Sequence, residues 1–138
     1  MKELEGDLYC DAGSRGNPGP AGVGVVIFNT STQKTIVEKS IFIGHTTNNA
    51  AEYAGLIHGL QLAQQHGITR VNIYLDSMLV VKHIQGEYKV RNSRLKPLYD
   101  RALDLLKLFG DGFSINHIER AKNHRADELA NESMNRGY

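Results

Sequence analysis

Four carboxylates stand where the regular segments predicted from the sequence begin or end. Asp11 is the last residue of the first apolar, β-rich segment, and Asp76 closes a later one. Glu52 and Asp127 fall in the first turns of two expected helices. In an α/β sheet, strand ends and the adjoining helix starts gather at one crevice, where ligands bind. These four acids, from four separate segments, can therefore meet at one place.

Such a meeting would have a defined chemistry. Two carboxylates ~4 Å apart repel by about 4 kcal/mol at an effective dielectric constant near 20, so some would stay protonated unless cations enter. Hard oxygen ligands select Mg²⁺, or Mn²⁺ in its place, and leave positions open for phosphate oxygens. Two such ions ~3.5–4 Å apart stabilise both the attacking and the leaving oxygen in phosphodiester cleavage. The pattern therefore indicates metal-dependent phosphodiester chemistry.

Each acid also has a purely structural explanation. Asn49 and Glu52 resemble a capping box, in which Glu52 satisfies a backbone donor. Asp76 could cap the short helix that follows it, and Asp127 could offset a helix dipole. Asp11 is the hardest to explain in this way, because strands are depleted in Asp. Together, these explanations require four separate coincidences at the same end of one sheet.

The segments that must position the acids follow from hydrophobic periodicity and from turn residues. The expected strands are residues 4–11, 22–28, 35–44, 71–75 and 113–118. The expected helices are residues 49–66, 78–84, 95–109 and 126–135. This order predicts an α/β fold with one mixed five-stranded sheet, in which three antiparallel strands come first and parallel strands follow, with helices on both faces.

Length and composition fit a single domain over residues 1–138, with 41% hydrophobic residues to build a core. The chain lacks the apolar run of about 18 residues that a membrane-spanning helix needs, and its N-terminus lacks the apolar stretch of a secretory signal. Its single cysteine, Cys10, excludes an internal disulfide and any zinc site built on several cysteines. We therefore expect a reducing, cytoplasmic compartment.

Basic residues are concentrated in one stretch, although the formal net charge is only +1. Between residues 82 and 101 the chain carries six Lys or Arg and two acids: Lys82, Lys89, Arg91, Arg94, Lys96 and Arg101 against Glu87 and Asp100. A solvated helix surface explains this stretch most simply. The basic stretch would indicate nucleic-acid binding only if a site that binds phosphates lay nearby.

Four sequence blocks, in this order, resemble type 1 ribonuclease H over nearly the whole chain. They are Tyr9–Ser14 with the turn Gly16–Pro20, then Thr46–Glu52, Asp76–Ser77 and Ala126–Ala130. The resemblance implies endonucleolytic cleavage of the RNA strand of an RNA–DNA hybrid, leaving 3′-hydroxyl and 5′-phosphate ends. We expect a monomer that acts on this hybrid and has no membrane partner.

The resemblance also assigns residues by position. Asp11, Glu52, Asp76 and Asp127 match the acids that hold two Mg²⁺ ions, and Asp11 would bridge both ions. The predicted substrate contacts are Gly13, Asn17, Thr47, Asn48, Asn49 and Ser77. Short amides and hydroxyls suit the 2′-hydroxyls of a wide, shallow minor groove and do not read base identity, so weak sequence preference is expected. Asn17 and Thr47 could equally serve the turn and the start of the helix.

The chain departs from larger members of that family in two places. The stretch 119–127 is compact, with His124 three residues before Asp127 and Arg120 seven residues before it. His124 could neighbour a helix cap, shuttle protons near neutral pH or be an ordinary surface residue, whereas Arg120 could contact a phosphate or the leaving group. Both are candidate catalytic residues. The stretch 85–96 is too short for a basic "handle" helix, which its Lys and Arg side chains would replace at lower affinity.

Three other functions compete with this one. A nucleic-acid-binding domain that cleaves poorly would not need all four acids. A resolvase- or transposase-type nuclease generally carries additional DNA-binding segments, for which 138 residues leave no room. A nucleotide hydrolase needs a phosphate clamp, and the chain has no Gly-x-x-x-x-Gly-Lys-Ser/Thr loop.

Overall fold

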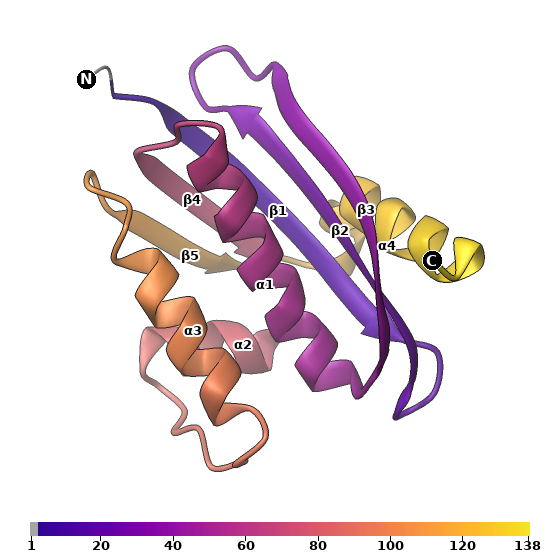
Figure 1. Ribbon diagram of the computed structural model, residues 1–138. Helices are drawn as coiled ribbons and strands as arrows, with labels where there is room; N and C mark the ends of the chain where they lie inside the picture. Colours follow the sequence, from indigo (N-terminus) through magenta and orange to yellow (C-terminus); the bar gives the residue numbers. More distant parts are fainter. Residues whose placement is uncertain (1–2) are drawn as a thin grey trace.

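A computed structural model describes residues 3–138 as one five-stranded sheet with helices on both of its faces (Figure 1). The strands are β1 (Glu5–Ser14), β2 (Gly19–Asn29), β3 (Thr35–Thr46), β4 (Arg70–Leu75) and β5 (Phe113–His117). The helices are α1 (Asn48–Gln65), α2 (Met78–Gln85), α3 (Lys96–Leu106), the short 3₁₀ helix η1 (Arg120–Asn123) and α4 (His124–Arg136).

The sheet has the order β3-β2-β1-β4-β5, so β1 is its central strand. The pairs β1–β2 and β2–β3 are antiparallel, whereas β1–β4 and β4–β5 are parallel. Parallel neighbours need crossover connections. The chain passes through α1 before it enters β4 beside β1, and α2 and α3 connect β4 to β5. The predicted fold class, with antiparallel strands first and parallel strands after them, is confirmed.

Two glycines allow helices to approach the sheet closely from opposite sides. A Cβ on Gly59 of α1 would lie 2.5 Å from the sulfur of Cys10 on β1. On the other face, a Cβ on Gly24 of β2 would lie 1.9 Å from the carbonyl oxygen of Ala126 on α4. Neither position has room for a side chain, so the two helices are held directly against the strands. Figure 1 shows α1 in front of the sheet and α4 behind β2 and β3.

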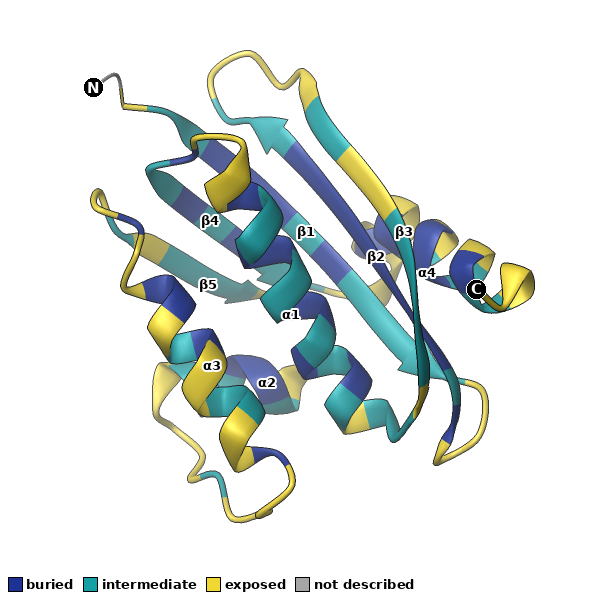
Figure 2. Cartoon of the chain, in the orientation of Figure 1, coloured by how far each residue is buried: buried dark blue, intermediate teal, exposed yellow. Residues whose placement is uncertain are grey.

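The main core lies between the sheet and helices α1, α2 and α3. Its largest fully buried side chains include Leu8, Ile27, Tyr53, Leu56 and Ile73. A smaller core under α4 contains Val26, Ala126 and Leu129. Figure 2 shows the buried residues running along β2 and through α1. The helices that carry part of the site are thus fixed by apolar burial on both faces of the sheet.

Several boundaries differ from the prediction. Strand β1 continues three residues beyond Asp11, because Ser14 still pairs with Ala21, so Asp11 lies inside the strand rather than at its end. Helix α1 begins at Asn48, and its N-cap is Thr47 rather than Asn49. The capping-box explanation is therefore wrong: the Thr47 hydroxyl caps the helix by accepting from the Ala50 N–H at 3.3 Å.

Two predicted features of the chain's second half are confirmed. The segment between Gln85 and Lys96 contains no helix, as expected for a chain without a handle. Residues 118–123 lead from β5 into α4 through η1, so the approach to Asp127 is compact. In residues 3–138, none of the helices has both the length and the apolar character that crossing a membrane requires.

Candidate functional site

The parallel register of β1 and β4 places Asp11 and Asp76 next to each other. Cys10 pairs with Leu75, and both side chains are buried, with Cys10 facing α1. Successive side chains of a strand point to opposite faces, so Asp11 points to the face that α4 covers. Asp76 follows Leu75 directly and takes the neighbouring position.

The third acid, Asp127, reaches the same place because α4 lies close to β2. Gly24 is the register partner of Asp11, and the carbonyl oxygen of Ala126 lies over Gly24. Asp127 is the next residue, in the first turn of α4. The predicted first-turn position of this acid is confirmed.

Glu52 comes from the start of α1 and is held by two side-chain donors. Its Oε1 accepts from the Asn48 amide at 3.1 Å, and its Oε2 accepts a short hydrogen bond from the Ser77 hydroxyl. Ser77 is also the N-cap of α2, accepting from the Val80 N–H. The alternative in which Asp76 caps that helix is therefore wrong, and the Asp76 carboxylate is not used as a cap.

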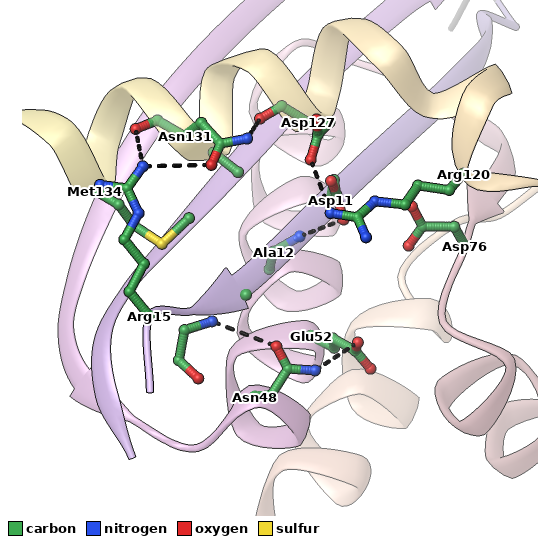
Figure 3. A pocket seen from close by; sticks show the side chains of 13 residues that line it. Asp11, Ala12, Arg15, Asn48, Glu52, Asp76, Arg120, Asp127, Asn131 and Met134 are labelled. Atoms are coloured by element: carbon green, nitrogen blue, oxygen red, sulfur yellow. Dashed lines mark hydrogen bonds and ion pairs between the residues drawn. The ribbon is translucent and has the colours of Figure 1, made fainter. Parts of the chain in front are cut away.

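All four carboxylates line one cavity of about 360 Å³ (Figure 3). Within residues 3–138, however, no three Asp, Glu, His or Cys side chains form a ready-made metal-ligand group. Glu52 accepts hydrogen bonds from Asn48 and Ser77, and Asp127 lies beside Arg120. The donor set itself, four hard carboxylates around one cavity, fits Mg²⁺ or Mn²⁺.

Electrostatics at the site favour a cation. Burial, then the charge of Asp76, then the adjacent Asp127 raise the pKa of Asp11 to about 8, against a smaller lowering by the Ala12 N–H. Burial also raises the pKa of Glu52, although the hydrogen bonds from Ser77 and Asn48 oppose this effect. Full ionisation of the cluster at neutral pH therefore needs compensating positive charge.

The structure brings Arg120 to the acids but not His124. Arg120 lines the acid cavity, with its Nη2 3.8 Å from Oδ1 of Asp127. His124 is the first residue of α4, and its Nε2 lies 3.1 Å from Oε1 of Glu128. It lines a different cavity, floored by Tyr9 and Phe28. The helix-start position is confirmed for His124, whereas its catalytic role stays a prediction that this placement does not favour.

A second cavity, of about 350 Å³, gathers most of the predicted substrate contacts. It is lined by Asn17, Thr47, Asn48, Asn49, Asn92, Arg94 and Leu95. The Asn17 side chain accepts from the Asn48 N–H at 3.0 Å and so joins the β1–β2 turn to the start of α1. Asn48 lines both cavities, which places them next to each other. Gly13 lies in the acid cavity, and Ser77 holds Glu52.

Sequence reasoning missed several residues that line these cavities, notably Arg15, Asn131 and Asn92. One signal was available, because Asn131 is four residues after Asp127 and must share its helix face. Arg15 and Asn92 lie in loops, whose direction no periodicity predicts.

A family model described as reverse transcriptase-like matches residues 9–133 of the chain. Among curated relatives, the bifunctional protein Rv2228c of Mycobacterium tuberculosis is 43% identical over 92% of this chain and 35% of its own length. Ribonuclease HI of Halobacterium salinarum is 42% identical over 91% of this chain and 62% of its own length. The chain thus spans about a third of the first of these relatives and less than two thirds of the second.

Solved structures agree with these relatives. The N-terminal ribonuclease H domain of Rv2228c superposes with a TM-score of 0.93 at 39% identity, covering 98% of this chain and 96% of that one. LC11 ribonuclease H1, solved in complex with an RNA/DNA hybrid, superposes with a TM-score of 0.88 at 41% identity, covering 95% of this chain and 97% of that one.

Proposed function

The chain belongs to the ribonuclease H family, and on this basis we propose that it is an endoribonuclease that hydrolyses the RNA strand of RNA–DNA hybrids. The proposed reaction uses two divalent cations and leaves 3′-hydroxyl and 5′-phosphate ends.

One observation carries this proposal: Asp11, Glu52, Asp76 and Asp127 come from four elements yet line a single cavity. A structural role would require only that each acid satisfy its own helix or strand. Instead, Thr47 and Ser77 cap the helices α1 and α2, and the carboxylates stay directed to the cavity. A binding domain without catalysis would have no need to gather repelling charges in this way.

Two Mg²⁺ ions, with Mn²⁺ as a substitute, would be held by these four acids and would stabilise charge on the attacking and leaving oxygens. The protein contributes orientation. Ser77 and Asn48 hold both oxygens of Glu52. Arg120 presents a guanidinium group beside Asp127 at the mouth of the cavity, where it can bind a phosphate oxygen.

The second cavity supports a hybrid substrate. Its lining is mostly neutral hydrogen-bonding side chains, such as Asn17, Thr47 and Asn49, with Arg94 as a cation. Neutral amides and hydroxyls suit sugar hydroxyls and backbone atoms, and the arginine suits a phosphate. Asn48 lines both cavities, so the second cavity adjoins the acids. One strand of the hybrid can therefore lie at the acids while the sugar–phosphate backbone of the substrate contacts the asparagines of the second cavity.

The assignment extends to the chain as a whole. We propose one catalytic domain over residues 1–138, acting as a monomer in the cytoplasm. The one continuous sheet supports a single domain, and the free, buried Cys10 supports a reducing compartment. Size-exclusion chromatography with light scattering tests the monomer, and a dimer mass would contradict it.

Cleavage of three labelled duplexes tests the proposed activity. Hybrid, duplex RNA and duplex DNA are incubated with the protein and Mg²⁺ or EDTA, and the ends of the products are analysed. We expect Mg²⁺-dependent cutting of the RNA strand of the hybrid by wild type and none by Asp11→Asn. Intact hybrid after incubation with wild type and Mg²⁺ would favour the non-enzymatic binding domain.

A further inference from the structure

The acid cavity extends beyond the carboxylates to a wall that the proposed chemistry does not use. This wall is built by Arg15, from the turn after β1, together with Asn131 and Met134 of α4. Figure 3 shows the Arg15 side chain reaching across to α4. Its Nη2 donates to the backbone oxygen and to Oδ1 of Asn131, both at 3.4 Å.

Asn131 is itself fixed in orientation. Its amide nitrogen donates to the backbone oxygen of Asp127 at 3.0 Å. With the nitrogen used there, the amide oxygen is left to accept from Arg15. A chain of two hydrogen bonds therefore links the guanidinium group of Arg15 to the helical turn that carries one of the four acids.

The charge of Arg15 has no carboxylate partner. Across residues 3–138, no Asp or Glu forms an ion pair with it, whereas Arg120, the other cation lining this cavity, faces Asp127. Neutral oxygens of Asn131 orient the guanidinium group without neutralising it, and most of its five N–H donors remain available. A positioned, unneutralised guanidinium group beside a cavity suits a phosphate, which it can bind with two parallel hydrogen bonds.

We infer that Arg15 binds a backbone phosphate of the hybrid that flanks the phosphate held at the acids, and that Asn131 is its positioning residue. This inference rests on the proposed function. Arg15 directly follows Ser14, the last residue of β1, and its guanidinium group contacts α4 at Asn131, four residues beyond Asp127. It is also two residues before Asn17, which lines the second cavity. The subsite thus continues the substrate path past the acids.

A double-mutant cycle on hybrid cleavage tests the inference. The variants are Arg15→Ala, Arg15→Lys, Asn131→Ala and the double Arg15→Ala/Asn131→Ala. Lys34→Ala is the matched control, since it removes the same charge from the β2–β3 turn, which lies at the other end of β1. Steady-state cleavage gives KM and kcat, and affinity for uncut hybrid is measured in EDTA over a range of salt concentrations.

We expect Arg15→Ala to raise KM about 5- to 10-fold with kcat within about twofold, and to reduce the slope of log affinity against log salt by about 1. Arg15→Lys should recover part of the affinity, because it keeps the charge but not the paired donors. Asn131→Ala should raise KM by a smaller factor, and the double variant should bind no worse than Arg15→Ala.

Two results would overturn the inference: an Arg15→Ala variant that matches Lys34→Ala in KM and salt slope, or single effects that multiply in the double variant. The first result would contradict the phosphate contact of Arg15, and the second would contradict the positioning role of Asn131. Neither result touches the proposed function, which fails separately if wild type cuts no hybrid. In that case the affinities in EDTA still decide whether Arg15 binds the duplex.

Discussion

Asp11 lines the acid cavity together with Glu52, Asp76 and Asp127, and this placement determines its protonation state. Its pKa is raised to about 8 by burial first, then by Asp76 and Asp127. An ordinary Asp ionises near pH 4. In the metal-free protein at neutral pH, Asp11 therefore tends to hold a proton, and a bound cation would release it. The clustering of carboxylates that is proposed to serve the reaction thus destabilises the metal-free fold.

The first prediction follows directly. Replacing Asp11, Asp76 or Asp127 by Asn should lower hybrid cleavage about 10³-fold or more, because metal-centred charge stabilisation contributes several kcal/mol and about 1.4 kcal/mol is a tenfold change in rate. In EDTA, the free energy of unfolding should be equal to that of wild type or higher, since repulsion is relieved. Labelled-hybrid assays and urea titrations measure the two quantities. Loss of the fold in these variants would instead support structural roles for the acids.

The second prediction concerns pH. The folded protein holds a proton on Asp11 that the unfolded chain releases near pH 4, so the resulting stabilisation is complete below about pH 4 and is lost as pH rises through about 8. In EDTA, wild type should therefore lose about 1–3 kcal/mol more than Asp11→Asn over this range, less than the full ~1.4 kcal/mol per pKa unit because the site is partly solvated. Urea midpoints from pH 4 to 9 test this. Parallel curves for the two proteins would contradict it.

The third prediction concerns Ser77, whose hydroxyl both caps α2 and donates to Glu52. Ser77→Ala should cost about 1 kcal/mol of stability through the lost cap. It should also raise the pKa of Glu52 further, because the lost hydrogen bond lowers that pKa. We therefore expect the Mg²⁺ concentration for half-maximal cleavage to increase several-fold at pH 7. Ser77→Thr, which keeps the hydroxyl, is the control, and equal Mg²⁺ dependence in both variants would exclude a role through Glu52.

At the scale of elements, most of the fold was predictable because the hydrophobic periodicity and the positions of the turn residues indicated the same helices and strands. The helix expected at 49–66 occurs as Asn48–Gln65, and Gly67 and Gly86 follow helices with positive φ as expected of helix stops. The end of β1 was not predictable, since Ala12 to Ser14 are turn-like in composition and are extended only because β2 pairs with them. The contact between Arg15 and Asn131 spans 116 residues, and no local pattern specifies it.

The fourth prediction belongs to the packing of α4. Gly24→Ala would place a methyl group 1.9 Å from the Ala126 carbonyl oxygen, so α4 must shift and carry Asp127 with it. We expect a loss of about 1–3 kcal/mol in the free energy of unfolding and a clear drop in cleavage. Gly110→Ala is the matched control, because no atom beyond residues 109–111 lies within 4 Å of its added methyl group. Its stability should stay within about 0.5 kcal/mol of wild type. Equal stability of the two variants would refute the close packing of α4.

At the scale of the whole molecule, the near-zero net charge conceals a local excess of positive charge between α2 and α3. The sequence showed a basic stretch but not which of its charges are free. The structure pairs Lys82 with Glu87 at 2.9 Å and Lys96 with Asp100 at 2.6 Å. Lys89, Arg91 and Arg94 lie on the exposed segment between α2 and α3, and in the described chain no carboxylate pairs with them. Arg94 also lines the second cavity, which connects this segment to the site.

The fifth prediction follows from these three charges. The triple variant Lys89→Ala/Arg91→Ala/Arg94→Ala should bind uncut hybrid more weakly and reduce the slope of log affinity against log salt by up to about 3, roughly one for each lost phosphate contact. Fluorescence anisotropy in EDTA at several salt concentrations measures both effects. Lys34→Ala/Lys39→Ala, on the β2–β3 side, is the control. An unchanged salt slope in the triple variant would remove this segment from the interface.

The pairing of Cys10 with Leu75 has a consequence for how such a chain can change. Strand residues alternate between faces, so one residue inserted into β4 would turn the carboxylate of position 76 toward the apolar interior, even with every side chain retained. Insertions in the turn between β2 and β3, at the far end of the sheet, leave that alternation untouched. Chain length within β1 and β4 is therefore a stricter constraint on this protein than the identity of most residues in either strand.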